Sequence, residues 1–245
     1  MKSYKKTFLT GFIISIFLLN TGCMNNPATG ENSFTGFMSK EKESKVGRKE
    51  HPKILKQFGG EYFEGSLNAY IRFIGKKLAA VSEVPNLPFR FTILNDERVN
   101  AFALPGGYVY ITRGLLALAN NEAEIAGVLA HEIAHITARH TAQRYSAAMA
   151  ANIGLNLFGV LGSAAGLPSG IGQVASFGAN AAIQGYSRNQ ELQADMLGVR
   201  YMTRAGYSPN GMTSFFKVLA AHSKLSTKQM GRNTQAYNIM STHPR

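Results

Sequence analysis

The sequence predicts a predominantly helical α+β fold that contains a small antiparallel sheet. In several long segments, apolar residues recur every three or four positions, which is the period of an amphipathic helix. Between residues 89 and 111 the pattern changes to alternation interrupted by turn residues, which is typical of short strands. With 245 residues, of which 45% are hydrophobic, the chain can bury the core of one sizeable domain.

The N-terminal segment, residues 1–22, is typical of a bacterial export signal, because lysines precede an apolar run that is short for a membrane span. Cys23, the only cysteine of the chain, follows directly. That position favours lipid attachment at Cys23 over an ordinary cleaved signal or an uncleaved anchor. Residues 23–38 are expected to form a tether, and residues 39–245 the folded domain.

The charge balance is strongly basic, with 26 Lys and Arg against 14 Asp and Glu and a net charge of +12. Removal of the export signal would leave 23 basic and 14 acidic residues. An exported protein seldom meets nucleic acid, so no nucleic-acid partner is expected. Attraction to an anionic membrane surface or to acidic substrates, and a simple solvated basic surface, both remain open.

The first part of the domain is predicted to form two helices and three strands. Ser39 is a suitable N-cap for a helix that ends near Gly59, and apolar spacing predicts a second helix over 66–81. Turn residues separate the predicted strands at 89–93, 99–103 and 108–111.

Asn121 is predicted to cap a helix that carries an H-E-x-x-H motif and runs past Arg144. His131 and His135 lie one turn apart on the same face, with Cβ atoms roughly 5–6 Å apart. Two imidazoles so placed can bind one metal ion at about 2.0–2.1 Å. Glu132 projects beside them, where it can contact a metal-bound water. Two chance histidines on a solvated helix are the alternative, so a third ligand is required.

The second part of the domain begins with an uncharged stretch of 43 residues, 145–187. A transmembrane hairpin is one interpretation, but interspersed polar residues favour helices that pack on the domain or touch the membrane surface. Further helices are predicted over 189–205 and from Ser208, and residues 224–236 are predicted to be loose. One side of the 189–205 helix carries Leu192, Met196, Val199 and Met202.

A third ligand is predicted in the 189–205 helix. Glu191 and Asp195 lie four residues apart, on one face. Glu191 can complete a three-ligand site that leaves a fourth position for water. Asp195 can accept the N–H of a ligand histidine, with His131 the favoured partner. A solvated acidic face is the alternative. His140 is expected to point away from the metal, in a surface or supporting role.

The motif at 131–135, followed by the S-R-x-x-E-x-x-A-D pattern at 187–195, resembles the HtpX-like and CAAX-prenyl-endopeptidase-like zinc metallopeptidases, peptidase family M forty-eight. The segment 100–110 resembles the one that precedes the active-site helix in this family. The resemblance covers about 39–245, and the lipoprotein start is most similar to the periplasmic, outer-membrane-attached members. It implies a gluzincin-like metallopeptidase domain that binds one Zn²⁺ per chain through His131, His135 and Glu191.

The resemblance also implies a function: an endopeptidase on the periplasmic side of the outer membrane, anchored by lipid at Cys23. The expected polypeptide substrates are unfolded or misassembled envelope proteins, and outer-membrane assembly machinery is a further candidate partner. Glu132 would act as general base. Tyr186, Arg188 or His222 would stabilise the oxyanion, and the sequence does not choose among them.

A binding protein is the competing interpretation, either an envelope chaperone or an outer-membrane assembly factor whose zinc is structural or latched. His243 could occupy the fourth metal position and hold the resting enzyme idle. The alternative for His243 is an ordinary surface histidine.

Overall fold

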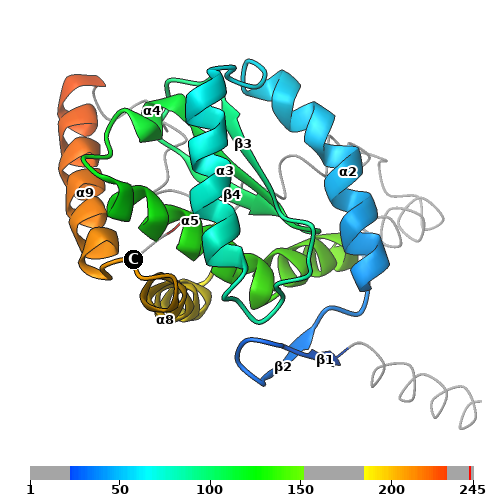
Figure 1. Ribbon diagram of the computed structural model, residues 1–245. Helices are drawn as coiled ribbons and strands as arrows, with labels where there is room; N and C mark the ends of the chain where they lie inside the picture. Colours follow the sequence, from blue (N-terminus) through cyan, green and yellow to red (C-terminus); the bar gives the residue numbers. More distant parts are fainter. Residues whose placement is uncertain (1–22, 152–184, 231–242, 244–245) are drawn as a thin grey trace, which may run out of the picture.

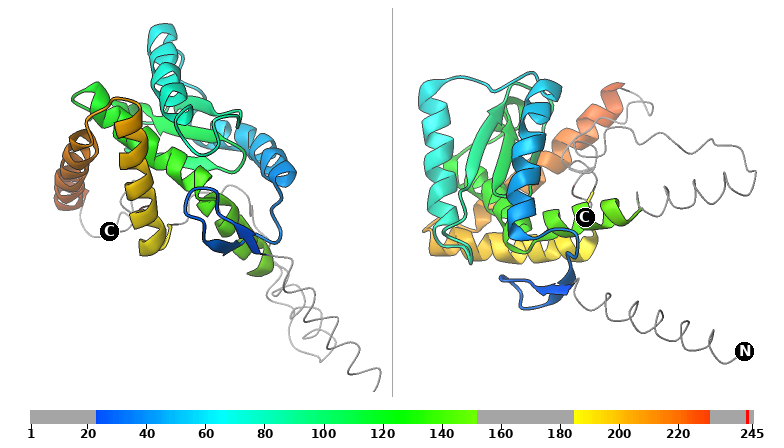
Figure 2. Two further views of the ribbon diagram at one scale, coloured as in Figure 1. Left: turned by 60° about the horizontal axis from the view of Figure 1, so that its bottom comes forward. Right: turned by 90° about the vertical axis from the view of Figure 1, so that its right-hand side faces the viewer.

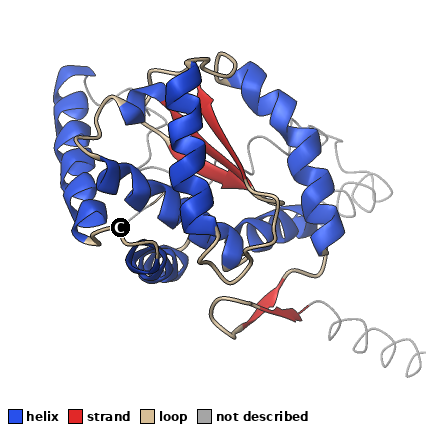
Figure 3. Cartoon of the chain, viewed as in Figure 1, coloured by secondary structure: helices blue, strands red, loops and turns tan. Residues whose placement is uncertain are grey.

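The computed structural model describes residues 23–151, 185–230 and 243 (Figure 1). Helices dominate these residues and surround one small sheet (Figure 3), in agreement with the predicted helical α+β class. The predicted export signal and the central residues of the uncharged stretch lie outside the described part. The described helices include none with the length and hydropathy needed to cross a membrane.

Two helices precede the sheet at the predicted places. Helix α2, Lys40–Gln57, begins at Ser39, whose side chain accepts a hydrogen bond from the Lys42 amide. Helix α3, Gly65–Ala79, begins at Glu64, which caps Leu67 in the same way. The buried apolar side of α3 packs on the sheet and on the central helix.

The sheet contains β3 (Arg90–Leu94), β4 (Ala101–Leu104) and β5 (Tyr108–Thr112) in the order β3-β5-β4. The antiparallel sheet expected from the sequence is wrong in one respect, since β5 pairs antiparallel with β4 but parallel with β3. Gly106 and Gly107, with φ of +83° and +93°, form a tight turn between β4 and β5. β3 and β4 follow one another in the sequence but are not neighbours in the sheet, because β5 lies between them.

Helix α5, Glu122–Thr137, is the centre of the molecule, and α8 (Arg188–Arg204) and α9 (Asn210–Met230) pack against it (Figure 1). A short helix, α4 (Arg113–Leu116), joins the sheet to α5. A Cβ atom on Gly127 would lie 2.8 Å from the Cα of Met212, and one on Gly198 would lie 3.3 Å from the His131 amide nitrogen. Glycines therefore permit the close approach of α9 and α8 to α5.

Two predictions about α8 and α9 are wrong. The apolar side predicted for α8 faces solvent over much of its length, since Leu192 and Met196 are 61% and 64% exposed. The inward face is instead built from Glu191, Ala194, Leu197, Gly198, Tyr201 and Met202. Helix α9 continues to Met230, so residues 224–230 are helical rather than loose; the rest of that predicted loop lies outside the described residues.

The segment expected to be a tether contains a short antiparallel hairpin, β1 (Cys23–Asn25) and β2 (Asn32–Phe34). It lies beside the C-terminal end of α5 and the N-terminal part of α8 (Figure 2). Asn26 is buried, and its Nδ2 donates a hydrogen bond of 2.8 Å to the carbonyl oxygen of Ala138. This contact fixes the hairpin at the end of the central helix.

Candidate metal centre

The two histidines of the H-E-x-x-H motif turn the same ring nitrogen toward each other. His131 and His135 are buried on α5, and their Nε2 atoms lie 3.0 Å apart. Glu191, projecting from the inward face of α8, places one carboxylate oxygen 3.5 Å from His131 Nε2 and the other 3.6 Å from His135 Nε2. The two motifs, distant in sequence, therefore converge on one point.

His243 reaches the same point from the C-terminal end of the chain. Its Nδ1 lies 3.0 Å from Glu191 Oε1 and 3.2 Å from His131 Nε2, and the residue is buried. One ligand atom from each of these four residues lies within 4.8 Å of all the others. We call His131, His135, Glu191 and His243 the metal cluster.

Glu132 lies next to the cluster without belonging to it. Its side chain is fully buried, and neither carboxylate oxygen has a hydrogen-bond partner among the described residues. Its Oε1 is 3.4 Å from His243 Nε2. Burial raises the pKa of the Glu132 carboxyl. A buried carboxylate with unsatisfied oxygens is costly unless a further group meets it there.

Asp195, one turn beyond Glu191 on α8, lies against His131. Its Oδ1 is 2.9 Å from His131 Nδ1. Burial alone would lower the pKa of His131, but hydrogen bonds to Asp195 and Glu191 raise it to about 9. By accepting the Nδ1–H, Asp195 leaves Nε2 of His131 turned toward the cluster, which is the arrangement a ligand histidine needs.

His140 does not point away from the metal cluster, so that prediction is wrong. It assumed a continuous helix, but α5 ends at Thr137 and Arg139 takes a left-handed φ of 57° before helix resumes over 140–151. Arg139 is held there by Glu43, at 3.1 Å, and by the carbonyl of Met38. The break swings His140 inward, where it is fully buried with Nδ1 3.0 Å from His135 Nδ1.

Of the three predicted oxyanion stabilisers, Tyr186 lies against the cluster. Its ring stacks on His135 with centroids 3.7 Å apart, and its buried hydroxyl has no partner among the described residues. Burial raises the pKa of this hydroxyl, so it stays a donor. Arg188 is exposed at the first position of α8, and His222 is half-buried on α9. No described contact joins either residue to the cluster.

The donor set of the cluster fits a zinc ion. Imidazole nitrogens with a carboxylate oxygen are common zinc ligands, and four donors match its preferred coordination number. Burial would raise the pKa of Glu191, but hydrogen bonds to His131 and His243 hold it at about 2, so the carboxylate is ionised. The unsatisfied oxygens of Glu132 are consistent with a further polar group between that residue and the cluster.

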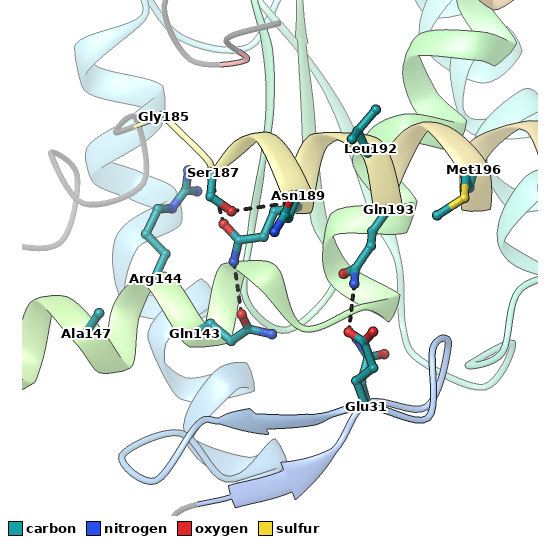
Figure 4. Close-up of a pocket in the computed structure, with 12 residues that line it drawn as sticks. Glu31, Gln143, Arg144, Ala147, Gly185, Ser187, Asn189, Leu192, Gln193 and Met196 are labelled. Atoms are coloured by element: carbon teal, nitrogen blue, oxygen red, sulfur yellow. Dashed lines mark hydrogen bonds between the residues drawn. The ribbon is translucent and has the colours of Figure 1, made fainter.

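A separate pocket lies outside α8, with a volume of about 890 Å³ (Figure 4). Its walls come from the hairpin, the helix after α5 and the start of α8, through Glu31, Arg144, Ser187, Gln193 and Met196 among others. None of the described residues that line it belongs to the metal cluster. Gln193 connects the two sites, because it lines the pocket and its Oε1 lies 2.9 Å from His140 Nε2.

The residues that form this site lie in the part of the chain that is similar to known proteins. The sequence profile of Peptidase family M48 matches residues 66–245. A beta-barrel assembly-enhancing protease of Yersinia pestis is 34% identical over 68% of the chain and 35% of its own length. The protein of the same name from Shigella flexneri is 30% identical over 73% of the chain and 36% of its own length.

Similarity extends to a eukaryotic protein. The mitochondrial metalloendopeptidase OMA1 of Schizosaccharomyces pombe is 29% identical over 82% of the chain and 57% of its own length. The chain thus spans about a third of the length of these bacterial relatives and somewhat more than half of the yeast one.

Proposed function

The chain belongs to peptidase family M48, and on that basis we propose that it is a zinc-dependent endopeptidase of the bacterial cell envelope. The observation that carries this proposal is Glu132, a buried carboxylate beside the metal cluster whose two oxygens have no hydrogen-bond partner in the described part of the chain. A hydrolase needs a base at that place, and a purely structural metal site does not.

Different residues of the chain have different roles in the proposed reaction. His131, His135 and Glu191 would hold Zn²⁺. When bound, zinc would polarise the scissile carbonyl and lower the pKa of a water molecule. Glu132 accepts the proton of the attacking water and returns it to the leaving amine, a role that suits its raised pKa.

Tyr186 is the proposed oxyanion stabiliser. Its hydroxyl stays protonated and is buried without a partner among the described residues, so it can donate a hydrogen bond to charge that develops beside the cluster. The stacked ring of Tyr186 also fixes the plane of His135.

The arrangement of the sheet narrows where substrate could pair. An extended substrate backbone can add to a sheet only at a strand that lies at an edge. β5 is paired on both sides, whereas β4 lies at one edge of the three-stranded sheet and is the proposed pairing strand. Main-chain pairing at an edge gives affinity without strict sequence preference, as an enzyme acting on unfolded chains requires.

Substrate class and location are proposed from the relatives and the N-terminal sequence. The bacterial relatives are named for enhancing β-barrel assembly, which supports unfolded or misassembled envelope proteins as substrates and the outer-membrane assembly machinery as a partner. A lipid on Cys23 would hold the domain on the periplasmic side of the outer membrane.

The test is a Glu132→Gln variant loaded with zinc. We expect it to bind zinc but to lose most cleavage of an unfolded, casein-like substrate. Glu124→Gln is a matched control, because Glu124 is also a buried glutamate on α5. Its carboxylate accepts hydrogen bonds from the Asn120 amide and the Ser214 hydroxyl, away from the metal cluster. Cleavage by Glu132→Gln at the parental rate would contradict the mechanism.

The alternative, a chaperone or assembly factor with a latched or structural zinc, is favoured by one observation: His243 lies within the metal cluster. In a latched resting enzyme, His243→Ala should raise basal cleavage. Cleavage of an unfolded outer-membrane protein by the parent and by His243→Ala should then be measured with zinc and with a chelator. Absence of cleavage by both the parent and His243→Ala would support a binding protein.

A further inference from the structure

We propose that a hydrogen-bond chain from the N-terminal hairpin, Glu31–Gln193–His140, positions His135 for metal binding by fixing which of its ring nitrogens carries the proton. The inference rests on the proposed function only in that the cluster binds a metal ion. It assigns positioning roles to Gln193, His140 and Glu31.

Three short contacts form the chain. The Gln193 Nε2 donates to Glu31 Oε2 at 2.7 Å (Figure 4). The Gln193 Oε1 lies 2.9 Å from His140 Nε2. His140 Nδ1 lies 3.0 Å from His135 Nδ1. Each contact uses a different atom of Gln193 or His140, so the three hydrogen bonds can all be donated in one direction.

The direction can be derived from the hairpin inward. The ionised carboxylate of Glu31 accepts hydrogen bonds and donates none, so the amide nitrogen of Gln193 must face it. The carbonyl oxygen of Gln193 then faces His140 and accepts the proton of its Nε2. A neutral imidazole carries one N–H, so His140 Nδ1 is an acceptor and takes the Nδ1–H of His135.

The same direction follows from the metal outward. A histidine that binds a metal through Nε2 carries its proton on Nδ1 and needs an acceptor for it. For His135 that acceptor is His140 Nδ1, which obliges His140 to donate from Nε2 to Gln193. The remaining donor of Gln193 then meets Glu31. Two independent starting points give one arrangement of protons.

Burial indicates how strongly each step acts. His140 and His135 are fully buried, Gln193 is half-buried and Glu31 is exposed, so the effect should fall from His140 toward the hairpin. Asn26, through its buried bond to Ala138, keeps the hairpin beside α5. The two histidines of the H-E-x-x-H motif are thus supported differently: His131 by a carboxylate directly, and His135 through two neutral side chains.

The first experiment measures zinc affinity of the full chain by chelator competition, together with the absorption spectrum of the Co²⁺-substituted protein. Gln193→Leu removes the acceptor for His140, and loss of such a supporting group lowers metal affinity by about 10–100-fold. The cobalt spectrum should change as well. The matched control is Gln190→Leu, one turn earlier, because the Gln190 side chain bonds to Gln143 and to the Ser187 amide but, among the described residues, not to His140.

The second experiment reverses the direction of hydrogen-bond donation between Gln193 and its two neighbours. The ammonium group introduced by Glu31→Lys attracts the carbonyl oxygen of Gln193, which turns the amide nitrogen toward His140 and favours the wrong tautomer of His135. We expect zinc affinity to fall several-fold, less than for Gln193→Leu because Glu31 is exposed. Adding Gln193→Glu provides oxygens toward both neighbours, so Glu31→Lys/Gln193→Glu should recover the parental affinity and cobalt spectrum.

The outcomes separate this inference from the proposed function. If the parent binds zinc and the zinc affinity of Gln193→Leu equals that of both the parent and Gln190→Leu, the positioning role of the hydrogen-bond chain is refuted while the peptidase proposal stands. Failure of the double variant to recover affinity would also overturn it. If the parent itself binds no zinc, the proposed function fails first. Melting temperatures of the zinc-free proteins, expected to agree between Gln193→Leu and Gln190→Leu, show that folding is not the cause.

Discussion

The two faces of helix α8 differ from the usual distribution of polar and apolar residues. The inward face carries Glu191 and Asp195, which meet the histidines of α5. The outward face carries Leu192, Met196 and Val199, all exposed. A surface helix normally turns its apolar stripe to the core. Because the inward face also buries Leu197, Tyr201 and Met202, the orientation of α8 satisfies apolar burial and the metal cluster together, and it leaves a second group of apolar residues exposed.

The energetics permit this arrangement. A buried carboxylate is costly unless it is paired, and both the buried Glu191 and the partly buried Asp195 have histidine partners. Ala194 and Gly198 let the inward face approach α5 closely. Isolated apolar side chains on a surface cost little, because much of any protein surface is apolar. The inward face should therefore be intolerant of substitution and the outward face tolerant.

The largest contrast should come from adjacent residues. Glu191→Gln removes a proposed ligand and its charge, so zinc affinity should fall by more than the about 10–100-fold expected for a supporting group, and peptide cleavage should be lost. Leu192→Gln, one position on and facing outward, should change neither. Metal analysis and a cleavage assay check both, and parental zinc affinity in Glu191→Gln would remove this residue from the site.

The next contrast concerns Asp195. In Asp195→Asn the acceptor for His131 loses its charge, so zinc affinity should fall about 10–100-fold, measured by chelator competition. Met196→Gln, its outward neighbour, provides the control. Equal affinities in the two variants would show that Asp195 does not support His131.

A third contrast tests close packing. A Cβ on Gly198 would already lie 3.3 Å from the His131 amide nitrogen, so Gly198→Leu should separate α8 from α5 and cost about 1–3 kcal/mol or more of unfolding free energy. Val199→Leu, on the outward face, should leave stability nearly unchanged. Denaturant unfolding measures both, and a Gly198→Leu protein as stable as the parent would show that the helices can move apart without cost.

The smallest effect should come from a charge on the outward face. Met196→Lys should alter the free energy of unfolding by no more than about 0.5 kcal/mol, as is usual for exposed positions, and should preserve zinc affinity. A larger loss of stability would mean that another part of the chain covers this face of α8.

The local features of the fold were predictable because each depends on neighbouring residues. Ser39, Asn121 and Ser187 cap helices where the sequence has a side chain suited to that role, and helical spacing alone placed His131 and His135 on one face. The motif at 187–195 indicated Glu191 and Asp195 as partners for that face. His140 could have been recognised only from the helix break at Arg139, which no local pattern announces.

The sequence by itself determined the helical α+β class, the motif residues and the peptidase family, since periodicity, caps and motif spacing are short-range properties. Only the tertiary structure decided that β5 lies between β3 and β4, that α8 turns its apolar stripe outward, and that His243 joins the cluster. It also brought Glu31 to Gln193, far apart in the chain. These features depend on contacts between segments that are distant in the sequence, so their free energies cannot be derived from any single segment.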